Sequence, residues 1–144
     1  MFSPTQADVR GFFVDARRKR REQLVLTPIE TIAADWIDAH PEYDADVGAA
    51  AFAPGAPAAP REGRENPFLH LSMHLSISEQ LAIDQPPGIR QAHDLLARRL
   101  GSQHAAQHEV MECLGRMLWD AQRSGGAPDG EAYVECVRRR ATRP

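Results

Sequence analysis

Apolar residues recur along most of this chain at intervals of three and four, the spacing that places side chains on one face of an α-helix. Capping residues, prolines and glycines separate the periodic segments. The expected helices run from a cap at Ser3 or Thr5 to about Glu22, from Thr27 to His40, from Pro67 to about Ile83, from Ile89 to Leu100, from Gln103 to about Arg123, and from Gly130 to about Ala141. The pattern predicts an all-α fold, a helical bundle of five to six helices.

The clearest helix start lies at Thr27, which Pro28 and Glu30 follow in the arrangement of a capping box. Pro41 disfavours helix at the residue before it, so the second helix is expected to end at His40. Gly101 can close the fourth helix in a left-handed conformation, and Ser102 can cap the fifth.

Residues 44–65 have a different amino-acid composition. They include the run GAAAFAPGAPAAPREGRE, in which Phe52 is the only large apolar side chain. This composition predicts one long Ala/Pro-rich crossover that is mobile. The segments before and after this crossover each look too small to bury a core of their own, and 144 residues suit one core. Residues 1–144 are therefore expected to form a single domain.

Composition narrows the class of protein. A net charge of −3 argues against a dedicated nucleic-acid-binding protein. No stretch approaches the roughly 20 apolar residues that a membrane span needs, and the first residues do not resemble a secretion signal. Cys113 and Cys136 are therefore expected to be reduced, buried thiols. Together these features predict a cytoplasmic protein that does not bind membranes.

Histidines supply the candidate chemistry. His70 and His74 are four residues apart on the third helix, on the side that faces apolar surroundings. On the fifth helix His104, His108 and Glu112 repeat at the same interval, toward the buried edge. His40 follows Trp36 at the same interval on the second.

Histidine pairs at this spacing can chelate one metal ion. Eight residues of helix rise about 12 Å, so His104 and Glu112 cannot both reach the ion that His108 binds. The one-ion set is therefore His70, His74, His108 and Glu112. His104 and His40 would then contact these ligands without touching the ion, or bind a second ion. Imidazole with carboxylate suits a divalent transition metal, Zn, Fe or Mn, and an open position would permit hydrolase or oxidoreductase chemistry.

A second interpretation needs no cofactor. Neutral histidines can be satisfied by serine, glutamine or backbone carbonyls. The chain would then be a non-catalytic interaction or adaptor module, with a protein partner or a second copy of itself. Its working surface would include residues 44–65 and the basic helix ends, Arg17–Arg21 and Arg138–Arg140, although positive charge at these ends also suits the helix dipole.

Three segments, NPFLHLSMHLSISEQ, DQPPGI and HEVMECLGRMLWDAQRSG, resemble the bacterial family known as domain of unknown function 1841. The likeness extends from GFF near the start, through HPEY at His40 to Tyr43, to DGEAYVECVRR. A histidine often follows HPEY in that family, whereas Asp44 stands here. The resemblance implies a helical bacterial cytoplasmic protein and supplies no activity.

Overall fold

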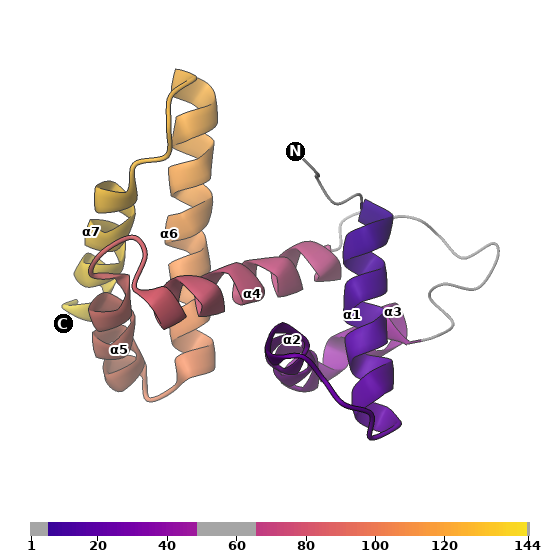
Figure 1. The fold of residues 1–144 in the computed structure, drawn as a ribbon. Helices are drawn as coiled ribbons and strands as arrows, with labels where there is room; N and C mark the ends of the chain where they lie inside the picture. The colour runs from indigo at the N-terminus through magenta and orange to yellow at the C-terminus, as the bar shows by residue number, and fades with distance from the viewer. Residues whose placement is uncertain (1–5, 49–65, 144) are drawn as a thin grey trace. The chain divides into compact units, whose positions relative to one another are not determined.

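The computed structural model describes residues 6–48 and 66–143, and within these ranges the secondary structure is entirely helical. Seven α-helices and one 3-10 helix occur there: α1 (Gln6–Arg21), α2 (Pro28–Asp38), η1 (Pro41–Tyr43), α3 (Asp44–Val47), α4 (Pro67–Ile83), α5 (Ile89–Leu100), α6 (Gln103–Ser124) and α7 (Gly130–Ala141) (Figure 1). The all-α prediction is confirmed, but the predicted number of five to six helices is wrong.

The additional helix is α3, at the start of the predicted crossover. Asp44 and Asp46 lie in its first turn, where negative charge suits a helix N-terminus. Tyr43 and Val47 are only 6% and 1% exposed, so packing stabilises an element too short to hold itself. Residues 49–65, the rest of the predicted crossover, lie outside the described residues.

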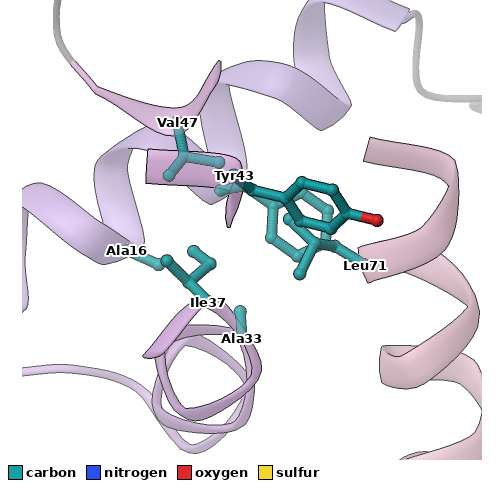
Figure 2. Close-up of a cluster of buried hydrophobic side chains, with 7 residues drawn as sticks. Ala16, Ala33, Ile37, Tyr43, Val47 and Leu71 are labelled. Carbon is teal, nitrogen blue, oxygen red and sulfur yellow. The ribbon is translucent and has the colours of Figure 1, made fainter. Parts of the chain in front are cut away.

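The chain divides into two compact units, Met1–Leu75 and Ser76–Pro144, called unit 1 and unit 2 below. The single-domain expectation stays a prediction. In unit 1, small and large apolar side chains from α1, α2, η1, α3 and the start of α4 point toward one another (Figure 2). The buried set is Phe13, Ala16, Ala33, Ile37, Tyr43, Val47 and Leu71. This cluster holds α2 and η1 against α4, which places the histidines described below.

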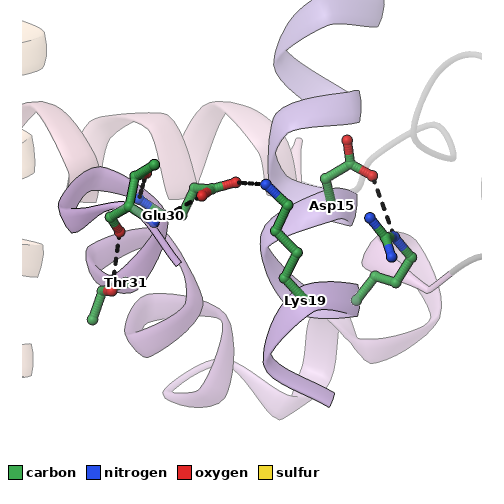
Figure 3. Close-up of polar contacts among 6 residues, drawn as sticks. Asp15, Lys19, Glu30 and Thr31 are labelled. Carbon is green, nitrogen blue, oxygen red and sulfur yellow. Dashed lines mark hydrogen bonds and ion pairs between the residues drawn. The ribbon is translucent and has the colours of Figure 1, made fainter. Parts of the chain in front are cut away.

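The capping box predicted for α2 is confirmed, and it also fastens α2 to α1. The Thr27 side chain accepts a hydrogen bond from the Glu30 amide, and the Glu30 carboxylate accepts one from the Thr27 amide at 2.9 Å. Lys19 Nζ donates to the other Glu30 oxygen at 2.6 Å (Figure 3). The hydrogen bond from Lys19, followed by that from the Thr27 amide, lowers the pKa of Glu30 to about 2.

In unit 2, α5, α6 and α7 pack around a buried apolar centre. Its fully buried members include Ile89, Leu96, Val110 and Val137. Ser102 and Asp129 cap α6 and α7, and Gly101 adopts the left-handed conformation predicted for the end of α5.

The start of α5 is satisfied from outside the helix. Asp84 Oδ1 accepts hydrogen bonds from the amides of Arg90 and Gly88, and these, the first most strongly, lower the pKa of Asp84. The Arg90 side chain donates in turn to the carbonyls of Leu81 and Ala82 at the end of α4. The two helix termini therefore satisfy each other's backbone groups.

The expectation of reduced thiols is wrong. Cys113 of α6 and Cys136 of α7 form a disulfide, with their Cα atoms 5.9 Å apart. Helical periodicity places both residues on inner faces, but it cannot show that residues 23 apart in sequence meet across a helix pair. The cytoplasmic location stays a prediction, and it loses the support of free thiols.

Among the described helices, none combines the length and the apolar character that crossing a bilayer requires.

Candidate metal centre

His40 is positioned by the end of α2. Its amide donates to the Ile37 carbonyl at 3.0 Å, and Pro41 then starts η1 instead of continuing the helix. The sequence predicts this stop. The resulting turn buries the imidazole, which is 2% exposed, within unit 1.

His70 and His74 lie on one face of α4, as their spacing predicts. Their ring centroids are 4.8 Å apart, and their side chains belong to residues only 8% and 0% exposed. Asn66 starts this helix as expected, because its side-chain oxygen accepts from the amides of Phe68 and Leu69.

Unit 1 brings these histidines together with His40. The Nε2 atoms of His40 and His74 are 2.9 Å apart. The His40 and His70 ring centroids are separated by 4.7 Å. The sequence predicts that His40 contacts the ligands without touching the ion, or binds a second ion. In the structure its Nε2 instead faces the Nε2 of His74, a predicted ligand.

The second nitrogen of His40 has a carboxylate partner. His40 Nδ1 lies 3.0 Å from a carboxylate oxygen of Glu42, whose side chain is 58% exposed. A carboxylate can only accept, so neutral His40 carries its proton on Nδ1 and presents the Nε2 lone pair to His74. The sequence-based prediction does not include Glu42. The signal that could have identified it as a partner of His40 is its position two residues later in HPEY.

Aromatic side chains fix the orientation of the rings. The Trp36 indole stacks on the His74 imidazole with centroids 3.8 Å apart and planes 12° from parallel. Tyr43 stacks on His40 at 5.1 Å. Both contacts restrict rotation of the imidazole rings. A histidine that binds a metal must hold its ring in one orientation, so these contacts prepare the rings for binding.

His104 and His108 are neighbours on α6 in unit 2, with ring centroids 4.4 Å apart. His104 is half-buried and His108 is exposed. Glu112 does not face the buried edge as expected: its side chain is 65% exposed and forms an ion pair with Arg140 of α7. The positive partner of Glu112 within the described residues is therefore an arginine. The one-ion set His70, His74, His108 and Glu112 combines residues of both units, and it stays a prediction.

His93 of α5 is also buried, at 4% exposed, although the sequence pattern does not mark it as a candidate. Its Nδ1 lies 3.2 Å from Asp94, and its buried Nε2 has no hydrogen-bond partner among the described residues. No second histidine contacts it there, so it offers a single nitrogen to a ligand.

The sequence pattern of one family, the domain of unknown function DUF1841, matches residues 5–139. The chain therefore belongs to the DUF1841 family, as its resemblance to that family indicates. Neither a curated protein nor a solved structure matches it.

Proposed function

We propose that this chain is a metal-binding helical protein whose unit 1 holds a divalent transition metal through the Nε2 atoms of His40 and His74. The observation that carries the proposal is the 2.9 Å approach of these two atoms, with Glu42 on the opposite nitrogen of His40. His70, whose ring is next to both, is the third imidazole available to the ion.

The geometry suits an ion after a small movement. Two imidazole nitrogens at about 2.0–2.1 Å from a tetrahedral zinc ion are themselves about 3.3 Å apart. The two rings therefore need to separate by a few tenths of an ångström. In the metal-free chain the His74 Nε2–H donates to His40, and metal binding moves that proton to Nδ1 of His74 or to solvent.

Glu42 supports the ion without touching it. A carboxylate on the far nitrogen of a ligating histidine fixes its tautomer and raises its basicity, and loss of such a partner lowers metal affinity by about 10- to 100-fold. Glu42→Gln should therefore weaken metal binding by about that factor while leaving the helical signal unchanged.

Elemental analysis and metal titration of the purified full chain test the proposal. Zn²⁺, Mn²⁺ and anaerobic Fe²⁺ should be titrated into the wild type, the variant pair His40→Ala and His74→Ala, and His93→Gln as a control outside the site. We expect a stoichiometric ion in the wild type and in His93→Gln, and its loss in both alanine variants, with helicity checked by circular dichroism. Unchanged metal content in the alanine variants, or no binding of any of the three ions to the wild type, would overturn the proposal.

The ligand set predicted from sequence has its own arm in this experiment. His108→Ala and Glu112→Gln should each lower the metal content if these two residues of α6 bind the ion. If only the His40 and His74 variants lose metal, the ligands come from unit 1 and the sequence-based set is wrong.

The alternative is a non-catalytic interaction module with structural histidines. One observation favours it: Leu118 and Trp119 of α6 are 48% and 58% exposed, although both are large apolar residues. The basic end of α1 favours it less than the sequence suggests, because its arginines and its lysine form ion pairs with carboxylates of unit 1. A chain that binds none of the three metals supports this alternative.

A further inference from the structure

A hollow on unit 1 is lined by three arginines of α1 and by none of the histidines. Arg17, Arg20 and Arg21 line it together with Asp38 and Asp44, and alanine, isoleucine and proline side chains complete the lining. The arginines meet because positions three and four apart share one face of a helix. We propose that this hollow is a binding site for a phosphate group, either free phosphate or a small phosphate monoester.

Ion pairs hold the guanidinium groups in place. Arg20 Nη1 donates to Asp35 at 2.7 Å and to Asp38 at 2.8 Å. Asp44 accepts from Arg17 Nη2 and, at 3.3 Å, from Arg21 Nη2. Arginines fixed in this way lose little further side-chain entropy when an anion binds.

These bonds leave donors for a ligand. A guanidinium has five N–H groups on three nitrogens, and the bonds to aspartate within the described residues use one nitrogen of each arginine. The lining contains three positive and two negative side chains, and Asp35, which is outside the lining, also pairs with Arg20. The ion-pair network therefore has three charges of each sign, and the attraction for an anion comes from the unused N–H groups.

Size and chemistry select the ligand class. The hollow has a volume of about 150 Å³, which equals the share of about five water molecules in the liquid. This space accepts a phosphate group with some of its waters. Guanidinium groups match phosphate oxygens in planar, paired hydrogen bonds, which favours a phosphate over a halide.

Isothermal titration of the full chain with inorganic phosphate, at constant ionic strength set by chloride, tests the site. Arg21 is the arginine to change, because its side chain is 63% exposed and its loss should not affect folding. Arg21→Gln should weaken phosphate binding by about three- to tenfold, the value of one charge-assisted contact at a partly exposed position. Arg18→Gln is the matched control: Arg18 belongs to the same basic run, pairs with Asp15 of α1 and with Glu22 directly after this helix, and does not line the hollow.

Asp44→Asn provides a test in the opposite direction. This change removes a competing negative charge and releases two guanidinium groups, so phosphate should bind several-fold more tightly. A merely structural ion-pair network predicts no gain. Equal weakening by Arg21→Gln and Arg18→Gln, no gain in Asp44→Asn, or no measurable binding to the wild type would each overturn the proposal.

Discussion

The disulfide between Cys113 and Cys136 makes a quantitative prediction about unit 2. In the Cys113→Ala, Cys136→Ala double variant the crosslink is lost, and the unfolded chain regains the freedom that it had removed. For a loop with the observed separation of 23 residues, the chain-entropy relation gives about 3.4 kcal/mol of stabilisation at 25 °C. Strain in the folded state would make the measured value smaller.

Urea unfolding followed by circular dichroism measures this effect. With a urea dependence of about 1–3 kcal/mol per molar, the midpoint should fall by roughly 1–3 M in the double variant. Dithiothreitol should lower the wild-type midpoint toward the variant and leave the variant unchanged. If the denatured wild type, never reduced, reacts with two equivalents of a thiol reagent, the crosslink is absent and the reasoning is refuted. The same holds if dithiothreitol does not change the midpoint.

Three further predictions concern unit 1. Leu71→Ala should cost about 2–5 kcal/mol in urea unfolding because Leu71 is 0% exposed, whereas Leu69→Ala, at a position on the same helix that is 58% exposed, should stay within about 0.5 kcal/mol of the wild type. Thr27→Ala should cost about 1 kcal/mol through loss of the cap on α2, and a midpoint equal to that of the wild type would contradict the capping role. The pKa of Glu30 is lowered to about 2 from 4.5, so its contribution is complete above about pH 4.5 and is lost as the pH falls toward 2; Lys19→Met should diminish this acid-dependent loss of stability, and parallel pH profiles of variant and wild type would contradict it.

Local signals in the sequence were sufficient for the longer helices. Thr27 and Glu30 mark the start of α2 because a capping box satisfies amides within four residues of the chain. Pro41 marks the end of that helix because its ring excludes helical geometry at His40. Neither signal depends on distant residues, so the sequence alone predicts both helix boundaries.

The parts that sequence reasoning missed depend on contacts between helices. α3 is only four residues long, and packing of Val47 stabilises it where helix propensity alone does not. The partner of Glu112 is Arg140, which lies on another helix 28 residues away. Periodicity gives the face of a helix on which a residue lies, but it does not give the residue that will meet it.

The same limit explains why the sequence predicts only a secondary role for His40. It follows α2 with no second histidine at helical spacing from it, and the turn into η1 and the packing of Leu71 place it against His74. A buried dication held by neutral imidazoles needs a nearby negative charge, because a low-dielectric interior does not screen it. Glu42 is the carboxylate in contact with His40, and its side chain remains largely in water, where keeping its charge costs little. It can therefore both hold the tautomer of His40 and offset part of the charge of an ion, so the loss of metal in Glu42→Gln would report both effects together.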